Sequence, residues 1–170
     1  MKSQGAAIGF ELGVMSNVDI YWSIAEEAFA SMQADMADSR TPKPNGEPGY
    51  IIRFDPNHRG FKNAMITVVF CGVFLDAFLY LALSHNLPKK KALSADRLPH
   101  EERLKMLGIT DQALLDRIKD FRNSRKSLVH EKAAPFAEIG NEPIHYAQQE
   151  AESAIHLMRD IQAQFSAPAS

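Results

Sequence analysis

The sequence is poor in several features that identify common protein classes. It contains a single cysteine, Cys71, which excludes an internal disulfide and any zinc site built from several cysteines. It lacks a glycine-rich phosphate-binding pattern, which argues against dinucleotide-binding and P-loop folds. Its formal net charge of −2 is too small for a protein that coats nucleic acid through bulk charge, although it leaves room for a local basic site. The first residues form no continuous apolar stretch, so we expect no signal peptide and a cytoplasmic protein.

What is present is enough apolar sequence for one sizeable core. The chain has 170 residues, of which 45% are hydrophobic, and this favours a single domain over residues 1–170. We expect its core to lie within about 17–165, with 1–13 and 166–170 loose. Apolar residues recur at helical spacing along four stretches, whereas strand-rich patterns are missing. The expected fold is therefore all-α, a four-helix up-down bundle.

The first predicted helix ends near Asp38 and is followed by a long connection. Its apolar stripe consists of Val18, Tyr21, Trp22, Ala25, Phe29, Met32 and Met36. Residues 41–59 then contain four prolines and two glycines, which cannot continue a helix. We expect a Pro/Gly-rich loop over about 39–60, with a short extended piece at Tyr50–Phe54.

Residues 64–83 are the most hydrophobic stretch, and two interpretations compete. At 20 residues the stretch is long enough to span a bilayer. Asp76 within it would cost roughly 2.5–3.5 kcal/mol near the membrane centre, and basic residues flank both ends. A helix that is apolar all round is also the expected centre of a soluble bundle, which the other amphipathic helices require. The core interpretation is favoured, and no membrane attachment is expected.

A second polar connection follows over residues 86–100. It contains Lys89, Lys90 and Lys91, which we interpret as a solvated loop, with nucleic-acid contact as the less favoured alternative. Residues 101–107 predict a short helical turn closed by Gly108, after which Thr110 is expected to cap the next helix.

The third predicted long helix, residues 111–132, contains the candidate functional residues. Leu114, Ile118, Phe121 and Leu128 form its apolar stripe, and Arg125 occupies the next position on that stripe after Phe121. A guanidinium at a core-facing position either stabilises a fixed anion or awaits one. His130 follows five residues later, and histidine is the side chain best suited to proton transfer near neutral pH. The last helix is expected to begin after Asn141 and Pro143.

Arg125 and His130 would suit metal-independent cleavage of RNA. On an ideal helix they point about 140° apart, so they converge only if the helix loosens near Val129 or if a second copy supplies one of them in a two-fold dimer. His130 would take the proton of a ribose 2′-hydroxyl, and Arg125 would stabilise the charge on the phosphoryl oxygens. A second acid, such as His130 of the other copy, would protonate the leaving 5′-oxygen.

Three further basic residues, Arg122, Lys126 and Lys132, add positive charge for the RNA backbone. From spacing alone, however, a structural interpretation is preferred. In it Arg125 pairs with Asp76 or Asp120, and His130 interacts with the dipole at the helix C-terminus.

The residues do resemble a known family. The four-helix pattern, with RKSLVHE closing the third helix, is similar to the HEPN domains, whose Arg-x4–6-His motif lies at that place. The segment LDAFLY resembles the family's apolar segment with an acidic residue. The resemblance implies a homodimeric, metal- and cofactor-independent endoribonuclease of toxin–antitoxin or defence systems, acting on RNA and associated with an antitoxin or other protein partner. Arg125 and His130 match its catalytic pair, and Asp76 matches its supporting acidic position.

Two positions depart from the family pattern. Lys126, which we expect to support Arg125, stands where many members have asparagine. Lys132 stands where members paired with a nucleotidyltransferase antitoxin have tyrosine, so modification by such a partner is not expected. Because some members are inactive, the resemblance is also compatible with a non-catalytic helical module that binds a partner protein or a nucleotide.

Overall fold

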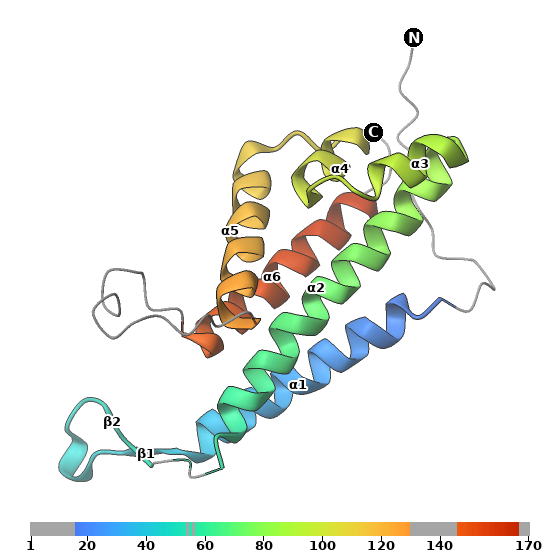
Figure 1. Cartoon of the computed structure of the whole chain (residues 1–170). Helices are drawn as coiled ribbons and strands as arrows, with labels where there is room; N and C mark the ends of the chain where they lie inside the picture. The colour runs from blue at the N-terminus through green and yellow to red at the C-terminus, as the bar shows by residue number, and fades with distance from the viewer. Residues whose placement is uncertain (1–15, 54, 56, 130–145, 167–170) are drawn as a thin grey trace, which may run out of the picture.

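The computed structural model describes residues 16–53, 55, 57–129 and 146–166. The predicted loose segments 1–13 and 167–170 lie outside them, whereas Ser166, expected in the tail, is still the last residue of a helix. Within the described residues the elements are α1 (Val18–Asp38), β1 (Arg40–Pro42), the 3-10 helix η1 (Pro44–Gly46), β2 (Tyr50–Ile52), α2 (Arg59–Asn86), α3 (Lys89–Ala95), α4 (His100–Met106), α5 (Gln112–Val129) and α6 (Ala147–Ser166). Helices therefore dominate, as an all-α class predicts (Figure 1).

The longest helix, α2, lies at the centre of the arrangement. It runs antiparallel to α1 along much of its length and also contacts α3, α4, α5 and α6 (Figure 1). The predicted stripe of α1 is confirmed, because Ala25, Phe29 and Met32 are buried against the core. The rings of Trp22 and Phe74 lie 5.1 Å apart, which fixes α1 on α2 by an aromatic contact.

One side of α2 is fully buried, and this bears on the membrane alternative. It includes Val68, Cys71, Leu75 and Leu79, all inaccessible to solvent. Among the described residues α2 is the one helix that is long and apolar enough to cross a membrane. This is weak evidence for insertion, because 56% of its most apolar part is covered by the other helices, as in the core helix of a soluble protein.

The stripes of α5 and α6 complete the core. Leu114, Ile118 and Phe121 of α5 are buried as predicted, and in α6 the buried positions include Ile155 and Met158. Buried side chains from α1, α2, α4, α5 and α6 form one continuous apolar cluster. The predicted start of the last helix at Asn141 and Pro143 lies outside the described residues.

The long connection between α1 and α2 contains a small β-hairpin. The predicted extended piece is confirmed at Tyr50–Ile52, which pairs antiparallel with Arg40–Pro42. Gly46 and Gly49 have φ values of +73° and +109°, which favour glycine and allow the chain to reverse. The hairpin lies at the end of the molecule opposite α3 and α4 (Figure 1).

Two predictions for the segment between α2 and α5 are wrong. Lys89, Lys90 and Lys91 form the first turn of α3 rather than a loop, because Ala92 and Ala95 pack against the end of α2. The cap of α5 is Asp111 rather than Thr110: its Oδ1 accepts a hydrogen bond of 3.1 Å from the backbone N–H of Ala113. The predicted short helix before Gly108 is confirmed as α4, and Gly108 has a φ of +88°.

Candidate functional site

Arg125 lies directly against the backbone of α2 at Gly72. A Cβ atom placed on Gly72 would come 2.5 Å from Nε of Arg125 and 2.7 Å from its Cδ and Cζ, too close for any real contact. The Arg125 side chain therefore fills the space that a residue larger than glycine would occupy. The predicted orientation toward the core is confirmed, although the arginine itself stays half-buried at the edge of the α2–α5 contact.

Arg125 has no carboxylate within ion-pair distance among the described residues, so the ion pair with Asp76 or Asp120 that the structural interpretation required is not formed there. Its stem is held by packing on Gly72 and its charge is not neutralised by a direct partner in that part of the chain. A fixed and partly accessible guanidinium of this kind can bind an incoming anion such as a phosphate.

Asp76 lies one turn after Gly72 on α2 and is the carboxylate that faces this region. Its Oδ1 accepts hydrogen bonds from Nε2 of His100 at 2.8 Å and from Nη1 of Arg103 at 3.3 Å. Partial burial alone would raise its pKa. The hydrogen bond from His100 and the charges of His100, Arg103 and Arg125 outweigh that effect, so the pKa of Asp76 lies below its usual value. The side chain remains 47% exposed, so it can still be reached from solvent.

His100 is the first residue of α4 and is buried. Because Asp76 only accepts hydrogen bonds as a carboxylate, the proton between the two side chains sits on Nε2 of the histidine. The other ring nitrogen, Nδ1, is shielded from solvent and has no hydrogen-bond partner among the described residues. His100 is therefore placed to orient Asp76.

Arg103, one turn later on α4, also bonds to Asp76 and to the residues just before α4. It is buried, its Nε donates to the carbonyl of Leu98 at 2.8 Å, and its Nη2 donates to the carbonyl of Asp96. Its Nη1 also lies 3.5 Å from the Asp96 carboxylate. Arg103 thus joins α2, α4 and the turn between α3 and α4, and it acts as a structural arginine.

The other predicted site residues differ in their surroundings. Arg122 is tied to Glu101 of α4 at 3.2 Å, which partly offsets the positive charge it would offer to RNA. Lys126 is exposed on α5 next to Arg125. His130 and Lys132 lie outside the described residues. Arg125 lies close enough to Asp76 for its charge to lower the pKa of that carboxyl.

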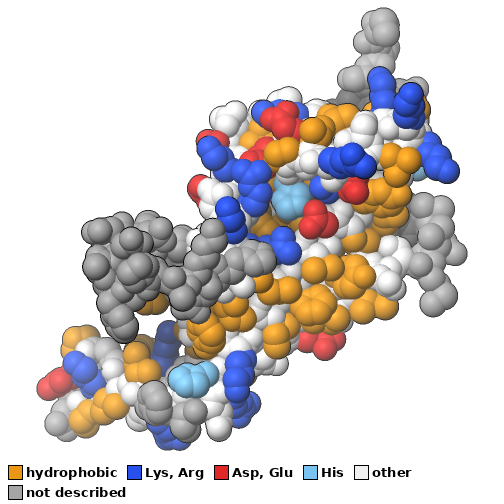
Figure 2. Space-filling view, in the orientation of Figure 1, with side chains coloured by type: hydrophobic (Ala, Val, Ile, Leu, Met, Phe, Trp, Pro, Cys, Tyr) orange, Lys and Arg blue, Asp and Glu red, His pale blue; other side chains and the backbone are white. Residues whose placement is uncertain are grey.

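Sequence reasoning missed His100 and Arg103. Both lie in the short helix α4. Positions 100, 103, 104 and 107 recur at helical spacing, and His100, Arg103 and Leu104 are buried. That spacing was the available signal. Figure 2 shows lysine, arginine and carboxylate side chains gathered on one part of this face, beside an area of hydrophobic side chains.

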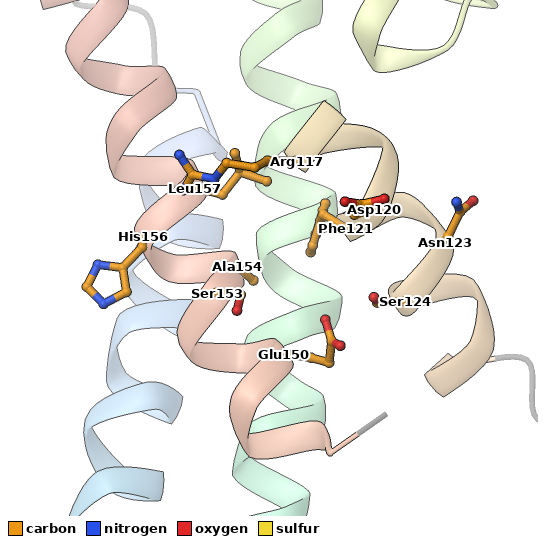
Figure 3. A pocket seen from close by; sticks show the side chains of 10 residues that line it. All are labelled: Arg117, Asp120, Phe121, Asn123, Ser124, Glu150, Ser153, Ala154, His156 and Leu157. Carbon is orange, nitrogen blue, oxygen red and sulfur yellow. The ribbon is translucent and has the colours of Figure 1, made fainter. Parts of the chain in front are cut away.

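A separate cavity of about 700 Å³ opens between α5 and α6 (Figure 3). Its lining is Arg117, Asp120, Phe121, Asn123, Ser124, Glu150, Ser153, Ala154, His156 and Leu157. Neither Arg125 nor Asp76 belongs to it, and Arg117 is already paired with Asp160 at 2.7 Å. Among the described residues, no three His, Cys, Asp or Glu side chains are grouped so that they could hold a metal ion.

Comparison with known proteins identifies no relative: no protein-family model, no curated protein and no solved structure matches this chain.

Proposed function

We propose that this protein is a metal-independent endoribonuclease whose four long helices, α1, α2, α5 and α6, form a HEPN-like up-down bundle. The observation that carries the proposal is the Arg125 guanidinium, which is held against Gly72, lies near the anionic Asp76 and has no carboxylate partner among the described residues. A leucine is the side chain expected at this position of an apolar stripe. The arginine therefore makes chemical sense as an anion-binding group.

In the proposed reaction, the imidazole of His130 removes the proton from a ribose 2′-hydroxyl. The resulting oxygen attacks the adjacent phosphorus, the bond to the 5′-oxygen breaks, and a second acid gives that oxygen its proton. Arg125 donates hydrogen bonds to the phosphoryl oxygens as their negative charge increases. The products are a 2′,3′-cyclic phosphate and a 5′-hydroxyl, and no step needs a metal ion or a cofactor.

We also propose that two copies join through the outward face of α2. Ile66 and Tyr80 on this face are each 40% exposed, and Val69, Val73 and Ala77 between them are half-buried. Their spacing places them on one side of the helix, next to Asp76. Figure 2 shows this hydrophobic area beside the charged one, so a second copy packed here would bring two sites together.

As a cellular role we propose a cytoplasmic nuclease of a toxin–antitoxin or defence system, restrained by an antitoxin or other protein partner. An unrestrained ribonuclease harms its own cell, and this is why a partner is part of the proposal. The apolar length of α2 fits a bundle core, since more than half of its most apolar part is covered by neighbouring helices.

The test is cleavage of a mixed-sequence RNA by the purified chain in the presence of EDTA. We expect cleavage by the wild type and none by His130→Ala, with the far-UV circular dichroism and melting temperature unchanged. His85→Ala serves as the control, because His85 is exposed near the end of α2 and should leave cleavage intact. Failure of the wild type to cleave any RNA, or full activity of His130→Ala, would remove the proposal.

The second candidate is a non-catalytic helical module that binds a partner protein or a nucleotide. The observation that favours it is that two of the charged groups are already engaged: Asp76 by His100 and Arg103, and Arg122 by Glu101. In that case His130→Ala should leave binding unchanged, and Arg125→Ala or Lys126→Ala should weaken it.

A further inference from the structure

We propose that Gly72 is a positioning residue for Arg125. Because Gly72 has no side chain, the surface of α2 leaves space for the Arg125 side chain at this point. Gly72 lies one helical turn before Asp76, so the guanidinium is held close to that carboxylate. This inference rests on the proposed function, because it names the residue that sets the geometry of the phosphate-binding arginine.

The contact is specific to this glycine. At Gly72 a Cβ would meet three atoms of Arg125 at 2.5–2.7 Å, whereas at Gly60, in the same helix, nothing lies within 4 Å of a Cβ. The backbone of Gly72 is ordinary helix with no positive φ, so conformational freedom is not the reason for glycine here. Space for the arginine is the remaining reason.

Glycine at this position also has a cost. Inside a helix, glycine is less favourable than alanine. A glycine that destabilises α2 and lies under a charged side chain therefore indicates a requirement of the arginine rather than of the fold.

Replacing Gly72 by alanine would force Arg125 to move. Carbon and nitrogen atoms settle at about 3.5–4.0 Å from one another, so the guanidinium would shift by ~1 Å or adopt another rotamer. A misplacement of ~1 Å in a group that binds the reacting atoms can reduce the rate on the order of 100-fold. We expect Gly72→Ala to lower RNA cleavage by about 10–100-fold, and Gly60→Ala to leave it within about twofold of wild type.

A double-mutant comparison separates positioning from a general structural role. In the Arg125→Ala background the clash partner is gone, so Gly72→Ala should cause no further loss of cleavage. Wild-type cleavage by Gly72→Ala, or a further loss in the double variant, would overturn the inference.

Two readouts decide the inference even if the wild type cleaves no RNA. The first is the urea midpoint of unfolding. Gly72→Ala should raise this midpoint in the Arg125→Ala background, where no clash opposes the better helix propensity of alanine, and the change should be less favourable in the wild type. The second is the NMR resonance of the Arg125 Nε–H group, identified by its loss in Arg125→Ala. It should shift or broaden in Gly72→Ala and stay unchanged in Gly60→Ala. Equal midpoint changes in both backgrounds together with an unmoved Nε–H resonance would show that Gly72 does not position the arginine.

Discussion

Asp76 and His100 lie 24 residues apart in the sequence and are joined by a hydrogen bond of 2.8 Å between Oδ1 of the aspartate and Nε2 of the histidine. This bond attaches α4 to α2 at the turn that follows Gly72. Together with Arg103 it lowers the pKa of Asp76 and fixes the orientation of its carboxylate. The short helices α3 and α4 therefore have a role in the proposed site as well as in covering the end of α2.

Removal of the His100 ring should destabilise the protein. In His100→Ala, Asp76 loses its shortest hydrogen bond and a cavity opens beneath α4, so we expect the free energy of unfolding to fall by about 1–3 kcal/mol. Urea unfolding followed by circular dichroism measures this change. His85→Ala, which removes an exposed histidine, should stay within about 0.5 kcal/mol of wild type. An equally small effect of His100→Ala would mean that the bond to Asp76 contributes little.

Stability should depend on the ionisation of Asp76 in a predictable direction. Its pKa in the folded protein lies below the ordinary value of 3.8. A group with a depressed folded pKa stabilises the fold above its unfolded-state pKa, and that contribution is lost as the pH falls through the folded value. The stability difference between wild type and Asp76→Asn should therefore be largest above about pH 4 and shrink at lower pH. Urea midpoints measured across this range would contradict the expectation if the difference grew on acidification.

Arg103 should hold the α3–α4 segment in place. Arg103→Ala removes hydrogen bonds to Asp76 and to the carbonyls of Asp96 and Leu98, and we expect a loss of about 2–3 kcal/mol. Hydrogen–deuterium exchange should increase first in residues 89–106, while α1 exchanges as in the wild type. Arg97→Ala is a suitable control, because Arg97 is exposed in the same turn. Uniformly faster exchange over all helices would argue against a local role.

The proposed dimer can be tested by charge on the outward face of α2. Ile66→Glu would place a carboxylate within the proposed apolar contact, at one end of it, and should convert a dimer into a monomer in analytical ultracentrifugation. Leu93→Glu, at an exposed apolar position on α3, should leave the dimer unchanged. A wild type that sediments as a monomer at every concentration would remove the shared site.

Much of the helical framework could be predicted because it depends on local periodicity. The buried positions of α1 and α5 follow their predicted apolar stripes, and the Arg125 position on its stripe correctly indicated contact with a neighbouring helix. The identity of that neighbour could not be read from the sequence, since nothing in the spacing connects residue 125 with residue 72. The helical state of Lys89–Lys91 was also missed, because α3 is stabilised by its burial of Ala92 and Ala95 against α2 rather than by its own propensity.

The contacts of Asp76 with His100 and Arg103 also could not be predicted from sequence spacing. Asp76 was predicted as a supporting acid from the family resemblance, and the structure places it near Arg125. His100 and Arg103, which help to lower its pKa, lie at helical spacing, but nothing in that spacing connects them with residue 76, and only the tertiary fold brings them to it.

The most direct measurement uses two RNA oligonucleotides that differ only by a 2′-deoxy sugar at the cleaved position. With EDTA present, we expect the wild type to cleave the all-RNA strand to a 2′,3′-cyclic phosphate and to leave the 2′-deoxy strand intact, while Arg125→Ala stays folded and cleaves at least about 100-fold more slowly. Cleavage of the 2′-deoxy strand, dependence on a metal ion, or full activity of Arg125→Ala would contradict the proposed ribonuclease mechanism.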